Sequence, residues 1–369
     1  MRGFLPDCGG AITRLAVSVV PQCFADHAAG RALRHALERF IPTLPAELSL
    51  TMLARGTSCR ALERWLDGIV VRCRIEHVDA DFPGGDDTMA LWTQDSFLVM
   101  DAGQTYLQPA SENATPHARW LSAGLDKTVR AKSFALAGGN MLVGPAFKLI
   151  GCESFPDQPA RRAAMMAALL QLDDRPVFEV GYRLGQGMPS DPAAWHYRMR
   201  QYGGHIDRSV AVTGLTREGN PLLVVANGVP GPGADPAGFG PIGDRLDRTA
   251  HALWAHGFAV LRNDVPFVPV LGGPQLRPRL YNNVLVENDV RPGRTRPLVW
   301  VPQFAEDEPI LEEFDRSNMA LWEGLGFEAV GAFGWSGLAA QMGALRCATK
   351  VLARGSPGAT GKGLPQPLS

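Results

Sequence analysis

The feature that most constrains this chain is a pattern that repeats along it: two β-like runs, an amphipathic helix, and another β-like run. Five such units of roughly 70 residues account for the whole ordered chain, although no unit resembles another strongly in its letters. The pattern predicts an α/β protein with a closed repeat architecture, because units that pair only with their neighbours must stack or close into a ring. Helices are expected at 28–40, 59–66, 159–172, 245–254 and 308–325, and the last segment, 343–352, is expected to return and close the ring.

The β-like runs complete this prediction, and two further segments are expected to lie outside it. Residues 229–243 contain five Gly and four Pro, which favours an irregular loop, and the Gly-, Pro- and Ser-rich tail 355–369 is expected to be disordered, which leaves 1–354 as a single domain. The expected strands are, in order of units, 15–20 and 48–53; 70–78 and 89–100; 133–136, 140–150 and 177–181; 205–213, 222–226 and 258–261; and 280–287, 298–303 and 327–333.

Composition excludes several classes of protein. The chain has 369 residues with 36 basic against 37 acidic side chains, and this balance argues against a nucleic-acid-coating protein. No apolar run is long enough to cross a bilayer, so no membrane partner is expected. The six cysteines form no CxxC pair, which disfavours a zinc ribbon or a disulfide framework. We therefore expect a cytoplasmic enzyme with reduced thiols and no structural metal.

Two short segments place carboxylates where burial is expensive. Asp95 follows Trp92 in the segment Trp-Thr-Gln-Asp, inside an apolar run where a carboxylate needs a cation, although a turn-capping Asp is an equal alternative. In Gly-Gly-His-Ile-Asp, strand alternation would put His205 and Asp207 on one face, where an acid/base and an anionic clamp could act together. The alternative is a structural histidine beside a surface Asp.

Two later segments carry an amide and a thiol. Asn283 opens an apolar strand in Tyr-Asn-Asn-Val-Leu-Val, where it can orient a side chain or cap a turn. Cys347 follows Arg346 in Gly-Ala-Leu-Arg-Cys-Ala-Thr, and a neighbouring Arg can lower a thiol pKa, whereas most lone cysteines only fill cores. Taken singly, none of these segments is specific.

Their order is specific. A WxxD segment, a Gly-Gly-Asn turn ending at Asn140, GHxD, a YxN strand followed by Val-Pro-Gln-Phe (301–304), and a late GxxxCxT resemble the guanidino-group-modifying enzymes. These enzymes form the pentein, or α/β-propeller, superfamily, whose fold has five ββαβ units around a pseudo-fivefold axis. The resemblance covers about residues 89–354. The WxQD and GxxxCxTxV segments favour the protein-arginine deiminase branch, and YxN with VPQF favours the agmatine deiminases.

The resemblance implies a hydrolase that converts an arginine guanidinium to the ureido group of citrulline and releases ammonia. A guanidinium carbon is a poor electrophile, so the site must grip the cation and attack it with a strong nucleophile. The resemblance assigns the clamp to Asp95 and Asp207, the nucleophile that forms a thiouronium to Cys347, and the proton transfers to His205. It also places Trp92, Asn140, Asn283 and Arg346 beside the substrate.

Two departures and several alternatives accompany this resemblance. Many members carry an acidic residue where this chain has Ala137, and the residue before the cysteine is His in the two nearest branches, where this chain has Arg346.

The alternatives are a deiminase or dihydrolase of agmatine or free arginine, an amidinotransferase, and a non-catalytic guanidinium- or peptide-binding protein. The chemistry needs no organic cofactor. The vertebrate protein-arginine deiminases need calcium; a calcium requirement is doubted here, and acidic pairs such as 86–87 and 173–174 are its only basis.

Overall fold

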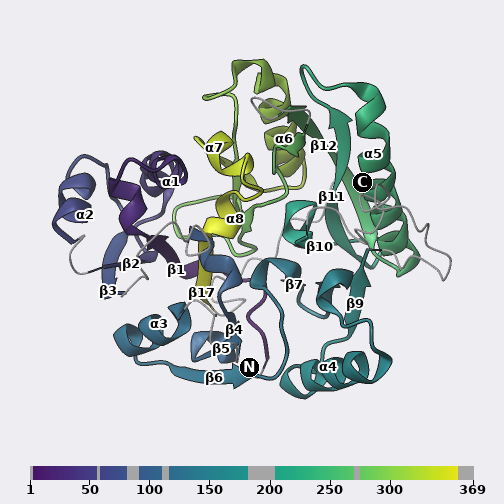
Figure 1. Cartoon of the computed structure of the whole chain (residues 1–369), viewed down its shortest axis with the longest axis horizontal. Helices are drawn as coiled ribbons and strands as arrows, with labels where there is room; N and C mark the ends of the chain where they lie inside the picture. Colours follow the sequence, from purple (N-terminus) through teal and green to yellow (C-terminus); the bar gives the residue numbers. More distant parts are fainter. Residues whose placement is uncertain are drawn as a thin grey trace.

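The computed structural model describes residues 3–55, 59–80, 91–109, 116–181, 204–269 and 275–355. In these residues the strands form five separate sheets, and each sheet contains an antiparallel pair joined to a parallel pair. Helices lie on the outer side of the arrangement, while β17 and α8 lie near its centre (Figure 1). This is the architecture that the repeated pattern predicts. None of the described helices is both long and apolar enough to cross a membrane.

The first sheet joins the two ends of the chain. Its order is β17-β1-β2-β3, with β1 antiparallel to β17 and parallel to β2. The prediction that the last segment closes the ring is therefore confirmed. The sheet and its helices are β17 (Thr349–Arg354), β1 (Ile12–Val19), α1 (Ala28–Phe40), β2 (Ser49–Ala54), α2 (Cys59–Leu66) and β3 (Arg74–Asp79).

The other four sheets follow in chain order around the centre. The second contains β4 (Leu98–Met100), β5 (Thr105–Pro109), α3 (His117–Leu125) and β6 (Thr128–Lys132), and the third contains β7 (Met141–Val143), β8 (Lys148–Gly151), α4 (Pro159–Leu172) and β9 (Val177–Val180). The fourth contains β10 (Val210–Arg217), β11 (Asn220–Pro230), α5 (Pro236–Ala255), β12 (Ala259–Pro269) and β13 (Leu276–Pro278). The fifth contains β14 (Leu285–Val286), β15 (Leu298–Pro302), α6 (Glu312–Gly324) and β16 (Glu328–Ala332), followed by the one-turn helices α7 (Ser336–Ala339) and α8 (Leu345–Ala348).

Helix α1 shows how the sequence specifies these units. The Nδ1 atom of His27 accepts a hydrogen bond from the backbone N–H of Gly30 at 3.3 Å and so caps the first turn. The buried residues Leu33, Leu37 and Phe40 then recur at intervals of four and three, so one stripe of the helix packs against the sheet.

A buried ion pair fastens the fifth unit to the first. Glu287 is fully buried and accepts hydrogen bonds from Arg291 at 2.6 and 2.8 Å. The same pair holds both backbone groups of Ile12, because Glu287 accepts from its N–H at 2.7 Å and Arg291 donates to its carbonyl at 2.6 Å. This contact fixes the start of β1 beside β14 and so helps to close the ring at a second point.

Three predictions about the elements outside the site are wrong. The predicted helix 59–66 and run 70–78 belong to the first sheet, and the second sheet uses α3 and β6 instead, which the sequence pattern did not single out. The run 133–136 is not a strand. Part of the predicted loop 229–243 is helical, because α5 begins at Pro236, and proline is well tolerated at the first helical position. The predicted disordered tail lies outside the described residues from 356 onward.

Candidate active site

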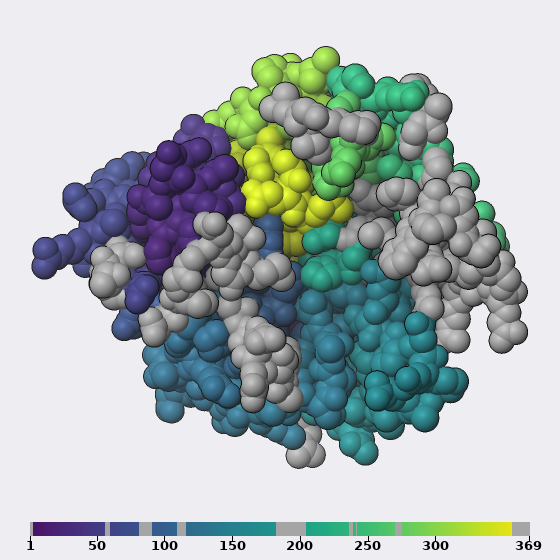
Figure 2. Space-filling view, viewed as in Figure 1, coloured from purple at the N-terminus to yellow at the C-terminus, as the bar shows by residue number. Residues whose placement is uncertain are grey.

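The predicted nucleophile lies near the centre of the molecule, on α8 (Figure 2, where the C-terminal part is yellow). Cys347 is 1% exposed. Asn283, which is fully buried, holds this cysteine at two points: its Oδ1 accepts from the Cys347 backbone N–H at 3.0 Å, and its Nδ2 lies 3.2 Å from Sγ. The same Nδ2 donates to the carbonyl of Asp207 at 3.1 Å. Asn283 therefore positions the thiol and offers its sulfur a hydrogen-bond donor.

His205 and Asp207 come together by a different route from the one predicted. The expected strand 205–213 is wrong at its start, because residues Ile206–Arg208 form a 3-10 turn, η10, and β10 begins only at Val210. The turn is fixed from outside: the backbone N–H of Ile206 donates to Asn140 Oδ1 at 3.2 Å. Strand alternation therefore does not align the two side chains, and tertiary contacts do.

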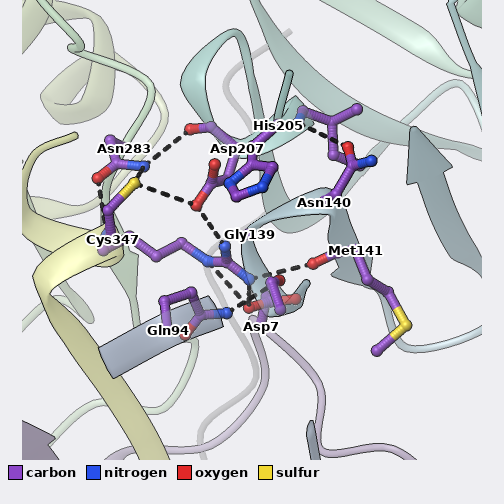
Figure 3. Close-up of polar contacts among 12 residues, drawn as sticks. Asp7, Gln94, Gly139, Asn140, Met141, His205, Asp207, Asn283 and Cys347 are labelled. Carbon is purple, nitrogen blue, oxygen red and sulfur yellow. Dashed lines mark hydrogen bonds and ion pairs between the residues drawn. The ribbon is translucent and has the colours of Figure 1, made fainter. Parts of the chain in front are cut away.

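Gly139 marks the point where three predicted site residues converge, and Figure 3 shows two of them, His205 and Asp207, near this glycine. A Cβ atom at this glycine would lie 2.7 Å from Asp95 Oδ1, 2.8 Å from His205 Nδ1 and 3.2 Å from Asp207 Oδ2. The glycine belongs to η7 (Gly138–Asn140), the Gly-Gly-Asn turn that the sequence marks only by its place in the order of segments. No side chain fits at this position without displacing a site residue, which is why a glycine is required here.

Asp95 is held by a backbone amide and by the histidine. It ends η5 (Thr93–Asp95), and its Oδ1 accepts from the Gly139 N–H at 2.8 Å and lies 3.4 Å from His205 Nδ1. The side chains of Asp95 and His205 are 13% and 21% exposed. Burial raises the pKa of Asp95, the negative charge of Asp207 adds to this rise, and His205 and the Gly139 hydrogen bond oppose it.

Asp207 is more deeply buried and has one oxygen without a partner. The residue is 0% exposed, and its Oδ2 accepts from Arg346 Nη1 at 2.6 Å and lies 3.7 Å from Cys347 Sγ. Its Oδ1 is buried without a hydrogen-bond partner among the residues that the structure describes. An unpaired carboxylate oxygen is expensive to bury, so this atom is available to accept a hydrogen bond from an N–H group of a ligand.

Arg346 is engaged by protein groups. Besides Asp207, its guanidinium donates to Asp7 Oδ1 from Nε at 3.2 Å and from Nη2 at 2.7 Å, and to the carbonyl of Met141 at 3.2 Å. Burial alone would lower the pKa of this arginine, but Asp7 and Asp207 reverse the effect and raise it above its ordinary value. Arg346 is therefore a permanent internal cation. It neutralises part of the negative charge of Asp7, Asp95 and Asp207, which together form the carboxylate cluster.

Sequence reasoning missed Asp7. It lies in the N-terminal segment, far from any motif, and no local signal connects it with Cys347. Its carboxylate accepts two hydrogen bonds from Arg346.

Two more of the predicted substrate contacts face protein groups. Trp92 is 9% exposed and packs on Gly343, where an added Cβ would lie 2.3 Å from the indole ring. Asn140 holds the η10 turn and donates to Ser154 Oγ at 2.6 Å. Both residues therefore shape the loops around Cys347 and Asp207, and direct contact of Trp92, Asn140, Asn283 or Arg346 with substrate stays a prediction.

The thiol is not ionised by its surroundings in the ligand-free protein. Burial raises the pKa of Cys347, and the charges of Asp207 and Asp95 raise it further, while the charge of Arg208 and a backbone hydrogen bond at Ala344 oppose the rise. A cation bound between the two carboxylates would cancel their effect, so the arrangement couples thiolate formation to the arrival of a positively charged ligand. Among the described residues no cluster of His, Cys, Asp and Glu could hold a metal ion, and the pair 86–87 lies outside them.

Comparison with solved structures identifies the fold. The agmatine deiminase of C. jejuni matches with a TM-score of 0.67 at 14% identity, over 96% of this chain and 97% of the other. The agmatine deiminase of Enterococcus faecalis matches with 0.64 at 12%, over 96% of both chains. A protein provisionally described as a peptidyl-arginine deiminase matches with 0.64 at 14%, over 96% and 99%. The chain has the pentein fold. The predicted fold class is thus confirmed.

Comparisons at the level of sequence find less. No protein-family profile and no curated protein matches the chain. The two agmatine deiminases named above share the fold with this chain at only 14% and 12% sequence identity.

Proposed function

We propose that this protein is a guanidino-group deiminase that hydrolyses a guanidinium to a ureido group and ammonia. The observation that carries the proposal is the buried carboxylate of Asp207: its Oδ1 has no partner among the described residues, and its Oδ2 lies 3.7 Å from the sulfur of Cys347. A guanidinium presents N–H donors in a fixed plane and a permanent charge, which are the two properties that this oxygen and Asp95 require. The fold of the solved deiminases supports the same assignment.

Binding prepares the nucleophile. Asp95 and Asp207 grip the guanidinium nitrogens and set its carbon beside Sγ, because Asp207 Oδ2 is 3.7 Å from that sulfur. The bound charge lowers the pKa of Cys347, which the two carboxylates raise in the free protein. Asn283 Nδ2 stabilises the thiolate by its hydrogen bond at 3.2 Å.

The reaction then has two halves. Sγ forms a bond to the guanidinium carbon, a C–N bond of that carbon breaks, and the nitrogen leaves as ammonia with a proton from His205. In the second half His205 removes a proton from water, the hydroxide adds to the thiouronium carbon, and the C–S bond breaks. The electron pair returns to sulfur, the hydroxyl proton is released and the ureido product leaves. His205 is suited to both proton transfers, because its side chain is more exposed than that of Asp95 and its Nδ1 lies 3.4 Å from Asp95 Oδ1.

For the substrate we propose arginine within a peptide or protein, on the strength of the WxQD and GxxxCxT segments. Agmatine is the second candidate, because the agmatine deiminases of two organisms share the fold over nearly the whole chain. The proposed site needs no organic cofactor, since water is the only co-reactant and the cysteine and the histidine are regenerated in each turnover.

The test measures ammonia and ureido product with a blocked arginine peptide, free arginine and agmatine, each with and without calcium. We expect product from the peptide in the absence of added metal. Product from agmatine alone would keep the deiminase and overturn the peptide assignment. Absence of ureido product from all three would overturn the enzymatic proposal.

The nucleophile has its own test. A haloacetamidine mimics a guanidinium and carries a leaving group, so it should alkylate Cys347, and substrate should protect the thiol. Cys347→Ser should lose nearly all turnover, because an alcohol is far less ionised than a thiol at neutral pH. Cys73→Ser serves as the control, because Cys73 is also nearly buried but lies outside the carboxylate cluster. A label on other cysteines, or an active Cys347→Ser variant, would refute covalent catalysis by this residue.

A further inference from the structure

A small cavity of about 40 Å³ lies next to the carboxylate cluster, where the sheets converge. It shares Gln94, Gly138 and Arg346 with the surroundings of the candidate site, and its wall also takes residues from the N-terminal segment, β4, β7, β14 and β17. A cavity needs roughly 10–15 Å³ to hold one water molecule, so this one has room for an occupant the size of two or three.

The charges on the cavity wall do not balance. The wall includes three cations, Arg346, Lys350 and Arg354, and one carboxylate, Asp7. That carboxylate is committed to Arg346, which bonds it from both Nε and Nη2. The other two cations therefore face the cavity without a carboxylate of their own.

Lys350 is the more deeply buried of these two cations. The residue is 5% exposed, and among the described residues its Nζ has a single hydrogen bond, to the carbonyl of Gln94 at 3.2 Å. The ring of Phe97, whose centroid is 5.4 Å from Nζ, gives a further weak contact. An ammonium group has three N–H donors, so most of its hydrogen-bonding capacity is unused.

Arg354 contributes a charge that cannot be lost by deprotonation. Its terminal nitrogens donate to the backbone carbonyls of Gly10, Val286 and Asp7 at 3.2, 2.8 and 2.7 Å. Its Nε is shielded from solvent and has no hydrogen-bond partner in the described structure. No carboxylate forms an ion pair with Lys350 or Arg354 within the described residues. Burying two cations in this way is costly unless an anion accompanies them.

We propose that this cavity is a binding site for a small monovalent anion of about the size of chloride, held by Lys350 and Arg354. The volume excludes a phosphate with its own hydration shell, and the remaining wall is largely apolar, with Leu98, Val143 and Leu285 among its residues. A halide is weakly hydrated and needs only one or two donors, so it suits a wall of this kind. The site is distinct from the clamp, which attracts cations.

The protonation of Lys350 is linked to this occupancy. Burial, together with the charges of Arg346 and Lys132, lowers the pKa of Lys350 to about 7, although the charges of Asp7 and Asp95 oppose this change. A bound anion favours the charged ammonium and raises this pKa, so by linkage the anion binds more tightly below pH 7 than above it. Anion binding should therefore weaken as the pH rises from 6 to about 8.

Bromide identifies the site directly, because it replaces chloride and scatters X-rays anomalously. Crystals of the unaltered protein in sodium bromide should show an anomalous peak within the cavity, in contact with Lys350 Nζ. In solution, replacing gluconate by chloride at constant ionic strength should raise the melting temperature by roughly 2–5 °C at pH 6. The rise should be smaller at pH 8.

Matched variants separate a specific site from a general salt effect. Lys350→Met should abolish the chloride-dependent rise, whereas Lys127→Met should keep it, because Lys127 bonds Gln104 at the surface. If Lys350→Met does not fold, the bromide experiment on the unaltered protein decides. An empty or water-filled cavity in bromide, or equal melting temperatures in chloride and gluconate, overturns the proposal.

Discussion

The two carboxylates of the candidate clamp face the same point above Gly139, but the protein holds them in opposite ways. Asp95 keeps 13% of its side chain exposed, and its contacts are a backbone amide and a histidine. Asp207 is completely buried, and one of its oxygens is locked by Arg346. The charge of Asp207 is therefore balanced before any ligand arrives, whereas that of Asp95 is not.

This difference in burial and in contacts bears on the pKa of Asp95. Burial raises the pKa of Asp95, because no full positive charge is hydrogen-bonded to it. We infer that Asp207 is the fixed half of the clamp and that Asp95 is the half that a bound cation stabilises. Substitutions on the two sides should therefore have different effects on stability and turnover.

The largest effect is expected from Asp207→Asn. The change removes a clamp charge and leaves Arg346 with a single carboxylate, Asp7, so kcat/KM should fall on the order of a thousandfold. The free energy of unfolding should also fall, by about 3 kcal/mol, because a buried ion pair loses one partner. Steady-state kinetics and denaturant unfolding measure the two effects. Asp26→Asn, at a carboxylate that is 98% exposed, is the control and should change neither.

Gly139→Ala tests whether the two halves must converge at one point. The added methyl group would lie within 2.8 Å of both Asp95 and His205, so these side chains must separate. We expect turnover to fall about a hundredfold, because misplacing a catalytic group by an ångström has effects of this size. Gly219→Ala is a comparison, since it has open space around it but a strained backbone. Normal kinetics in Gly139→Ala would show that the three residues do not act together.

Asp95→Asn should have a smaller effect on turnover than Asp207→Asn. It removes one charge-assisted hydrogen bond to substrate, worth about 1.5–3 kcal/mol, which corresponds to a factor of ten to a hundred in kcat/KM. Because no buried cation loses its partner, the folded state should not be destabilised. A variant that binds and turns over substrate like the parent would show that Asp95 is only a turn residue.

The smallest effect is a difference in stability that depends on pH. The unfolded chain releases the proton of Asp95 around its ordinary pKa of 3.8, whereas the folded protein keeps this proton to a higher pH. This group therefore makes folding less favourable as the pH rises from 3.8 to the raised pKa of the folded state. Asp95→Asn removes the penalty. Its free energy of unfolding should equal or exceed that of the parent at pH 7, and the advantage should disappear below about pH 3.8. A loss of stability at pH 7 would contradict the inference that the charge of Asp95 is unbalanced in the ligand-free protein.

How much of this could be predicted differs from element to element. Helix α1 was predicted because its periodicity is a local signal, and the return of β17 was predicted because a closed repeat architecture needs its last segment to complete the ring. The α5 boundary was missed, since the glycines and prolines of 229–243 favour a loop, whereas the helix begins at Pro236. The grouping of α2 with the first sheet was missed because the sheet to which an element belongs depends on strands that are distant in the sequence.

For the candidate site, the residue types came from the sequence, and their relations came from the fold. Asp95, His205, Asp207 and Cys347 are identifiable in order along the chain, because each chemistry needs a particular side chain. Strand alternation did not bring His205 to Asp207; the Asn140 hydrogen bond to the η10 turn did. The pairing of Arg346 with Asp7 spans 339 residues and leaves no local trace. Short-range pattern determines which groups are present, but only ring closure decides which charges meet, because electrostatic neighbours are set by distance in space.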